Sequence, residues 1–420
     1  MQGTASQVGI GWDVAAGRTV GGWSRVRGTP GAVAASVLLI YGLWLTVFFV
    51  SGKSVWTFAG VGREHVLAAH SSSVIKLYPY GQYSNAWGYD GQFYYFIALD
   101  PVHARDYIPD TVDQTKDYRY TRILYPMVAR LLAVGRADLI PYTLVLVNLL
   151  AITGGALALA AWLRRKQLSP WFALIFGLCP GIFIALVRDV TEPLAFGLVA
   201  LAVYLYDAGG RRRILWCGIC YALAVLSRES VAVFPLVHGI ALLIEDRNHS
   251  GMRRWLRGGS LLTLAIGPIL LYKLFLWLWL GPPKLPPNAR LQLIPLHGLV
   301  AYWPAHAFDR VDAAVTVVVP ALICAGMALW ALWKGVRRVE VWMLLANIQL
   351  FVVMLNPNNY MDPSGFPRHA AGVVLAALYC LPVFDVIANK RRGWLWASSA
   401  LWLLPAVFWL VLTPALLLLS

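Results

Sequence analysis

The sequence has few charged residues. They make up 13% of its 420 residues, about half the fraction usual in soluble globular proteins. Hydrophobic residues reach 59%, and apolar stretches of about 20 residues, long enough to cross a hydrocarbon core of ~30 Å, recur from residue 31 onward. The composition excludes a soluble protein and predicts a polytopic integral membrane protein.

The motifs of common soluble enzymes are also lacking. The chain has no P-loop, no Rossmann fingerprint, no GxSxG and no HExxH, so the templates for nucleotide binding, serine hydrolysis and zinc peptidases do not apply. The GxGD and GxSG patterns of intramembrane proteases are absent too.

Cysteine is scarce, and all five cysteines lie in apolar stretches. We expect these cysteines to be small buried hydrophobic residues rather than redox or metal ligands.

Basic residues alternate between the two sides of the predicted membrane spans. One set of short connections holds 19 Lys and Arg residues against six acids, and such loops stay cytoplasmic. This places the N-terminus inside and the C-terminus outside. The net charge of +15 is thereby explained by topology, and no nucleic-acid partner is expected. Residues 1–30 form a cytoplasmic tail without a signal-peptide core, so residues 31–50 are predicted to be an uncleaved anchor.

The predicted fold class is all-α, a transmembrane helical bundle with about 11 spans. Residues 31–420 form a single domain, and its largest non-spanning piece is an extracytoplasmic loop over residues 51–138. The predicted spans are 31–50, 139–163, 169–187, 190–206, 214–226, 230–244, 258–280, 313–333, 338–355, 370–388 and 394–418.

Two helices are predicted inside the large outer loop. The first runs from Gly91 to Leu99, with Asp90 as its N-cap and Pro101 as its stop. The second covers residues 119–136, where apolar residues recur at helical spacing opposite a basic side, a pattern typical of a helix lying along the membrane surface. Interfacial helices are therefore expected in this loop.

Asp90 and Asp100 cannot act as a pair of catalytic carboxylates if the segment between them is helical. Ten residues of helix rise ~15 Å, whereas glycosidase carboxylates lie about 5–9.5 Å apart. Asp100, next to Pro101, is read as a helix-end residue. Asp90 is the candidate, because Gly91 would let a substrate approach the backbone and a helix N-terminus stabilises a carboxylate. A plain N-cap is the competing interpretation.

Most other polar residues without a topological role fall on the outer side. Ionisable groups at the ends of buried spans are costly and mark function or pair with one another. The residues on that side with Asp90 are Arg119, Arg122, Arg188, Asp189, Glu192, Arg228, Glu229, Asn356, Asn358, Arg368 and His369. Lys273, toward the outer end of the 258–280 span, could snorkel to the interface or meet a lipid phosphate.

Several of these stretches resemble one family of membrane enzymes. "YDGQFYYFIA" (89–98) resembles the W/Y-D-G-x-(W/F)-Y-x-x-I-A motif of GPI-mannosyltransferase-type and related bacterial members of the GT-C superfamily. "RILYPMVARLLA" (122–133), "TEPLAFGLVALAVYLY" (191–206) and "LSRESVAVF" (226–234) are similar to its F-P-L-Y-P, S-E-x-L and S-R-x-x-G segments. The resemblance covers residues 31–245, and Glu229 stands where the family often has a small residue or proline.

The resemblance implies a glycosyltransferase that uses a polyprenyl-phosphate sugar at the outer leaflet. In that family a first-loop aspartate acts as general base on the acceptor hydroxyl, and Asp90 occupies its position. The leaving phosphate needs cations, for which Arg119, Arg122, Arg228, Arg368 and Lys273 are the candidates; Arg suits the task best. Gly91, Tyr94, Asp189, Glu192, Glu229 and His369 are supporting candidates. No tightly bound cofactor or metal site is assigned, and dependence on a divalent metal stays open.

The expected partners are membrane lipid, the lipid-linked donor and a glycan, lipid or protein acceptor, in a bacterial plasma membrane. The alternative is a transporter or flippase of a lipid-linked or small polar substrate. Transporters usually show internal repeats and charges near the bilayer midplane, whereas here the charges gather at one surface and no repeat is evident.

Overall fold

The regular secondary structure of the described part of the chain is entirely helical. Within these residues every regular element is a helix and none is a strand, which confirms the predicted all-α class for this part of the chain. The structure, a computed structural model, describes residues 28–64, 88–106, 108, 115–245, 252, 255–283, 292–301, 311, 314–355, 359–360, 365–388, 402 and 410.

Four helical stretches in the described ranges are long and apolar enough to cross a membrane. They are α1 (Pro30–Val50), Ala137–Arg165, which contains α8 (Ile140–Arg165), Trp255–Leu280, which contains α15 (Ser260–Leu280), and α21 (Phe366–Ile387). A further candidate is the pair Pro170–Leu178 and Pro180–Val187, which bends by 47° at its break. The chain is thus membrane-embedded by length and composition, with fewer qualifying helices than the predicted number of about 11 spans.

The remaining apolar helices are shorter. A helix of 15 residues, such as α12, rises only ~22 Å, which is less than the ~30 Å of a bilayer core. The shorter helices therefore do not meet the length needed to cross a membrane alone, although each coincides with a predicted span. These shorter helices are α11 (Glu192–Ala208), α12 (Arg213–Ser227), α13 (Val233–Glu245), α18 (Val319–Trp333) and α19 (Val339–Ile348).

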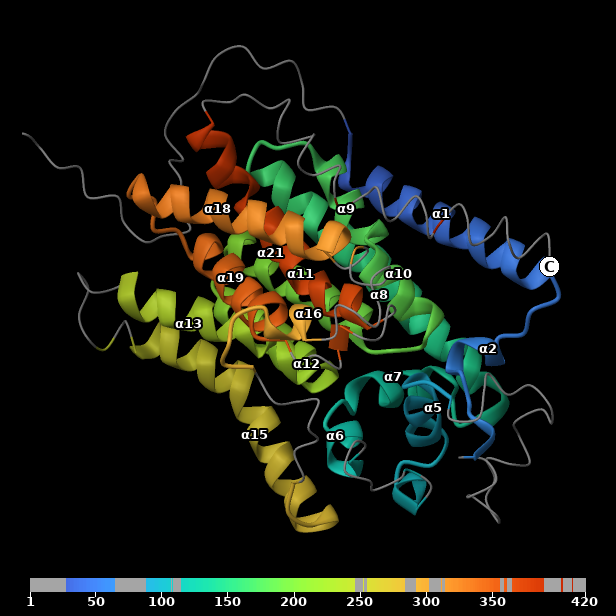
Figure 1. Ribbon diagram of the computed structural model, residues 1–420. Coiled ribbons are helices and arrows are strands. Elements are labelled where there is room, and N and C mark those ends of the chain that lie inside the picture. The colour runs from blue at the N-terminus through green and yellow to red at the C-terminus, as the bar shows by residue number, and fades with distance from the viewer. Residues whose placement is uncertain are drawn as a thin grey trace, which may run out of the picture.

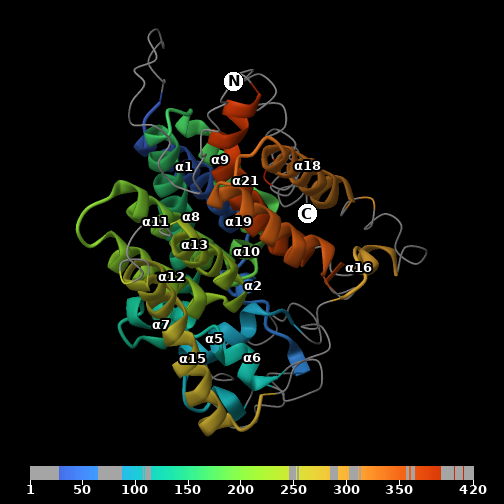
Figure 2. The same ribbon diagram turned by 90° about the vertical axis from the view of Figure 1, so that its left-hand side faces the viewer.

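Helix α8 is one of the main packing elements of the bundle (Figures 1 and 2). It packs against α1 and α11, while α11 also packs against α12, and α12 against α15. Trp162 of α8 meets Tyr379 of α21 edge to face, with ring centroids 4.9 Å apart. All five cysteines are buried and free, as predicted.

Short helices from the first loop gather at one end of the bundle. Both views place α2 (Trp56–Ala59), α5 (Gly91–Leu99), α6 (Lys116–Tyr120) and α7 (Leu124–Leu132) there. The bounds of α5 match the prediction. The single helix predicted over 119–136 is wrong: it is divided into α6 and α7, with Pro126 in the first turn of α7, where proline is tolerated.

Helix α5 is a buried helix rather than an interfacial one. All nine of its residues are buried, because apolar and aromatic side chains surround it and leave no polar face. Arg130 belongs to the basic side of the surface helix predicted over residues 119–136. In the structure its Nη1 donates to the carbonyl oxygens of Ala98 and Leu99, at 2.8 and 2.6 Å. It thereby satisfies carbonyl groups that the end of α5 leaves without helical partners.

A backbone contact joins the bent pair to α21. A Cβ added at Gly181 in α10 (Pro180–Val187) would lie 2.1 Å from the carbonyl oxygen of Pro367. Only glycine allows this approach, and the contact sets where α21 begins relative to α10. The next residues of α21 are Arg368 and His369.

Two predicted pieces lie outside the described residues. These are the cytoplasmic tail up to residue 27 and the last span, residues 394–418, apart from Trp402 and Leu410. Asn356 and Asn358, two of the polar residues predicted on the outer side, also lie outside the described residues.

We expect Gly181→Ala to lower the free energy of unfolding by about 2 kcal/mol, because overpacking a close contact forces the backbone apart. Thermal unfolding of the detergent-solubilised protein measures it. Gly154→Ala in α8 is the control, since a Cβ there meets nothing within 4 Å and alanine favours a helix. Equal midpoints for Gly181→Ala and wild type would contradict the close contact.

Candidate active site

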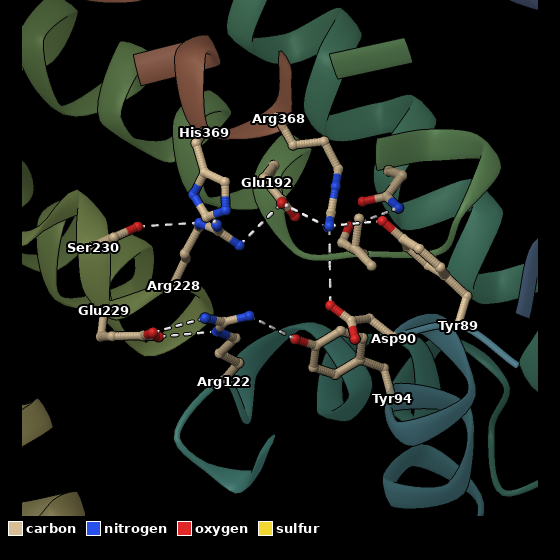
Figure 3. Close-up of polar contacts among 12 residues, drawn as sticks. Tyr89, Asp90, Tyr94, Arg122, Glu192, Arg228, Glu229, Ser230, Arg368 and His369 are labelled. Atoms are coloured by element: carbon tan, nitrogen blue, oxygen red, sulfur yellow. Dashed lines mark hydrogen bonds and ion pairs between the residues drawn. The ribbon is translucent and has the colours of Figure 1, made fainter. Parts of the chain in front are cut away.

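A cluster of arginines and carboxylates lies where α5 and α6 meet the bundle (Figure 3). Its members come from segments far apart in the sequence: the start of α5, α6 and the turn after it, the start of α11, the end of α12, and the first turn of α21. Salt bridges join some of these residues in pairs, and others in groups of three. The residues are Asp90, Arg119, Arg122, Glu192, Arg228, Glu229 and Arg368.

Asp90 is held by two guanidinium groups. Its Oδ1 lies 2.8 Å from Nη1 of Arg119, and its Oδ2 lies 4.0 Å from Nη2 of Arg368. The predicted N-cap role is wrong, because the backbone of Asp90 is already helical (φ −55°, ψ −32°) and its side chain makes no capping hydrogen bond. The carboxylate points to the arginines instead. Its side chain keeps 28% of its surface exposed, so a ligand can reach it.

Glu192 joins two arginines through a single oxygen. Both Nη1 of Arg228 and Nη1 of Arg368 lie 3.0 Å from its Oε1, and Glu192 has no exposed surface. As the first residue of α11, it also lies at the positive end of a helix dipole. Arg228 donates to Ser230 Oγ at 3.0 Å, and Arg368 donates to the Tyr89 hydroxyl at 2.8 Å.

Arg228 also reaches a histidine. Its Nη2 lies 3.3 Å from Nδ1 of His369. Because a guanidinium only donates, that ring nitrogen accepts and carries no proton in this contact. His369 therefore adds no charge to the cluster.

Arg122 forms a separate and fully matched pair. It donates from Nε and Nη2 to the two carboxylate oxygens of Glu229, at 3.0 and 2.7 Å, the bidentate geometry that strengthens such pairs. Its Nη1 donates to the Tyr94 hydroxyl at 3.2 Å. The guanidinium also stacks over the Tyr118 ring at 4.3 Å.

The cluster brings arginines and carboxylates close together in a buried place. Among the described residues, four guanidinium groups, each at most 6% exposed, lie beside three carboxylates. Buried ions need partners, because removal from water costs several kcal/mol per ion. Several guanidinium groups in one place suit an anionic ligand such as a phosphate.

Gly91 has a structural role that differs from the one expected. A Cβ there would lie 2.3 Å from the carbonyl oxygen of Arg188 and 3.0 Å from that of Ala59. The space beside the glycine is thus filled by the chain's own backbone, and the expectation that a substrate approaches there is wrong. Gly91 instead lets α5 press against the turn after α10, which fixes Asp90 in the cluster.

Asp189 belongs to a second, separate group. It adopts φ 46° and is fully buried, and it accepts a hydrogen bond from the Tyr125 hydroxyl at 3.4 Å. Asn148 donates to that hydroxyl at 2.9 Å and to the Val190 carbonyl at 3.1 Å. Burial raises the pKa of Asp189 well above its usual range, despite the Tyr125 hydrogen bond, so it serves as a buried neutral group in the turn.

Most of the predicted site residues converge, but Asp189, in its separate group, and Lys273 do not. Lys273 is exposed on α15 and takes no part in the cluster's ion pairs among the described residues. Sequence analysis missed the aromatic supports: Tyr89, Tyr118 and Phe93, whose ring lies 4.5 Å from the Arg119 guanidinium. Their spacing was the available signal, since Tyr89 precedes Asp90 and Phe93 is one helical turn after it.

In the part of the chain that the structure describes, no group of three or more His, Cys, Asp or Glu side chains is placed to hold a metal ion. Comparisons of the chain with protein-family models, with curated proteins and with solved structures found no match. Functional conclusions therefore depend on the residues of the site.

The arginines change the acidity of Asp90. Burial raises the pKa of this carboxyl, but the Arg119, Arg368 and Arg122 guanidiniums together outweigh burial and lower the pKa to about 2. A carboxylate with a depressed pKa stabilises the fold above its unfolded pKa of about 3.9, and the contribution is lost as the pH falls through the folded pKa.

We therefore expect Asp90→Asn to reduce the unfolding free energy at pH 6 by at most about 2 kcal/mol. The difference from wild type should shrink between pH about 4 and about 2. Chemical unfolding across this pH range measures it, with Asp138→Asn, in the exposed Arg136–Asp138 pair, as control. A difference that does not change with pH would contradict the ion pairing of Asp90.

Proposed function

We propose that the chain is a membrane glycosyltransferase that moves a sugar from a polyprenyl-phosphate donor to an acceptor hydroxyl. One observation carries the proposal: a partly exposed carboxylate, Asp90, lies beside the buried guanidinium groups of Arg119 and Arg368. Such a site combines a base for a hydroxyl proton with cations for a phosphate leaving group.

Each step of the reaction has a candidate group. Asp90 takes the proton of the acceptor hydroxyl while the hydroxyl oxygen forms a bond to the anomeric carbon. The bond from that carbon to the phosphate oxygen breaks, and arginine guanidiniums neutralise the released phosphate. Attack opposite the leaving group inverts the anomeric configuration. A carboxylate with a pKa of about 2 takes the proton only late, when the attacking oxygen has become positively charged.

The membrane arrangement completes the proposal. The predicted topology of about 11 spans, with the N-terminus inside and the C-terminus outside, puts the cluster at the extracytoplasmic face of a bacterial plasma membrane. Helices that are short alone would then cross where the bilayer thins locally around the bundle. Donor and acceptor, which could be a glycan, a lipid or a protein, would meet at that face. The donor is a substrate, and no tightly bound cofactor is assigned.

We expect Asp90→Asn to lower the transfer rate by about 10²–10⁴-fold, since it removes a general base. The measurement is release of sugar from labelled polyprenyl-phosphate donors by the protein in liposomes, with membrane insertion checked in parallel. Asp138→Asn, an exposed acid paired with Arg136, should leave the rate unchanged. Transfer at the wild-type rate by Asp90→Asn would overturn the assignment of the base.

A second function, transport of a lipid-linked or small polar substrate, is favoured by one observation. The pair Pro170–Leu178 and Pro180–Val187 is bent by 47° at a short break, and broken helices often form the substrate sites of transporters. The transport proposal predicts movement of substrate across liposomes without any covalent change. Single-cysteine variants along Pro180–Val187 labelled from both sides would support transport, and labelling from one side only would count against it.

A further inference from the structure

Arg188, at the end of α10, is a fifth arginine beside the cluster. Its guanidinium carbon lies 4.6 Å from the centre of the Tyr89 ring, and the hydroxyl of the same tyrosine accepts a hydrogen bond from Arg368 at 2.8 Å. Tyr89 directly precedes Asp90 in the sequence. Arg188 thus contacts the residue next to the candidate base, although it takes no part in the ion pairs of the cluster.

Arg188 differs from the arginines of the cluster in its partners and in its exposure. The four that lie against carboxylates are Arg119, Arg122, Arg228 and Arg368. Among the described residues, no carboxylate forms an ion pair with Arg188, and no acceptor takes a hydrogen bond from its guanidinium. Arg188 is also only half-buried, whereas the other four are at most 6% exposed. An anion from outside the chain can therefore reach this guanidinium without displacing a carboxylate.

The turn that carries Arg188 has a defined hydrogen-bonded form. The backbone N–H of Val190 donates to the Ala185 carbonyl at 3.0 Å, and that of Asp189 donates to the Leu186 carbonyl at 3.2 Å. These two bonds make a Schellman motif at the end of α10. Asp189 takes its left-handed position with φ 46°, and aspartate is one of the few residues besides glycine that visit this region. The motif fixes the backbone from which the Arg188 side chain extends.

Packing also holds this turn against the site. The carbonyl oxygen of Arg188 lies only 2.3 Å from where a Cβ on Gly91 would be, so the start of α5 and the turn are in close contact. On the buried side, the Tyr125 hydroxyl donates to Asp189 at 3.4 Å. Asn148 donates to that hydroxyl at 2.9 Å and to the backbone carbonyl after Asp189 at 3.1 Å. The separate group around Asp189 therefore has a role: it positions the turn that carries Arg188.

We infer that Arg188 binds the phosphate group of the lipid-linked donor, and that the Tyr89 ring holds the Arg188 guanidinium in place for this contact. The inference rests on the proposed function for the identity of the anion and adds a binding residue outside the cluster. A guanidinium offers paired N–H groups to phosphate oxygens, and an arginine stacked on an aromatic face keeps these edge groups available. Binding at Arg188 breaks no ion pair among the described residues, so the cluster stays intact around Asp90.

Two other roles for Arg188 make different predictions. A cation at the C-terminal end of a helix is stabilised by the helix dipole, and this role predicts that replacing Arg188 lowers stability without changing phosphate binding. A half-buried arginine at a membrane surface can also extend to phospholipid headgroups. That role predicts that any anionic phospholipid occupies Arg188 as well as the lipid-linked donor does.

The test measures binding of farnesyl phosphate to the full chain in phosphatidylcholine nanodiscs at fixed ionic strength, with farnesol as the uncharged control. Arg188→Gln should raise the Kd for farnesyl phosphate by about tenfold or more, because it removes a hydrogen bond between two charged groups. Arg188→Lys keeps the charge but loses the planar fork, and should raise the Kd by about three- to tenfold. The Kd for farnesol should be the same in all variants.

Arg105 provides a matched control on the same predicted outer side. It belongs to η1 (Ala104–Asp106), is also half-buried, and lies over the Trp279 ring at 5.3 Å, but it has Asp106 as an ion partner at 3.8 Å. Arg105→Gln should change the Kd for farnesyl phosphate by less than about threefold. An equal loss in Arg105→Gln and Arg188→Gln would reveal general surface attraction and overturn the inference. Wild-type affinity in both Arg188 variants would overturn it too, whatever their stability.

Two competitors identify the source of the phosphate. Inorganic phosphate that displaces farnesyl phosphate at equal concentration would indicate a free-phosphate site. Nanodiscs of phosphatidylglycerol that weaken farnesyl phosphate binding in wild type but not in Arg188→Gln would indicate a phospholipid site. Either result would overturn the assignment to the donor, and binding that resists both competitors supports it.

The binding assay contains no sugar and no transfer step, so it can fail separately from the proposed function. The expected Arg188 pattern in a protein that transfers no sugar would uphold the phosphate site and refute the glycosyltransferase. Active transfer, with wild-type affinity in Arg188→Gln, would do the reverse. If Arg188→Gln does not fold, Arg188→Lys is the deciding variant.

Discussion

The ion contacts of Glu192 are the interaction on which the rest of the site depends. A carboxylate with no exposed surface would be costly alone, and two guanidiniums at 3.0 Å compensate it. These arginines come from the end of α12 and the start of α21, so the contact ties three helices together at one point. Asp90, Tyr89, Ser230 and His369 are all placed through the same two arginines.

Close backbone packing supports this electrostatic centre. Gly181 lets α10 touch the first turn of α21, and Gly91 lets α5 touch the turn after α10. Each contact sets a helix start to within a fraction of an ångström, because the atoms have no space to shift. Arg130 fixes the other end of α5 through two carbonyl oxygens. The charged groups are therefore held by the backbone on which they stand, as well as by their own ion pairs.

Preorganisation of this kind suits a reaction in which charge develops on a phosphate. Guanidiniums that are already desolvated and fixed need no rearrangement when the leaving group becomes more negative. The described ion pairs differ among the arginines. Arg119 lies against Asp90 and Arg122 against Glu229, while Arg228 and Arg368 both contact Glu192.

Composition and charge pattern determined the all-α class, the membrane setting and the limits of α5, because these follow from hydrophobic length and local helix signals. They also pointed to the polar residues that converge. Tertiary packing decided the rest: that α5 is buried, that Gly91 faces the Arg188 carbonyl, and that Lys273 stays apart. Which arginine meets which carboxylate depends on contacts between residues as far apart as Glu192 and Arg368, and no local pattern in a single sequence encodes such a distance.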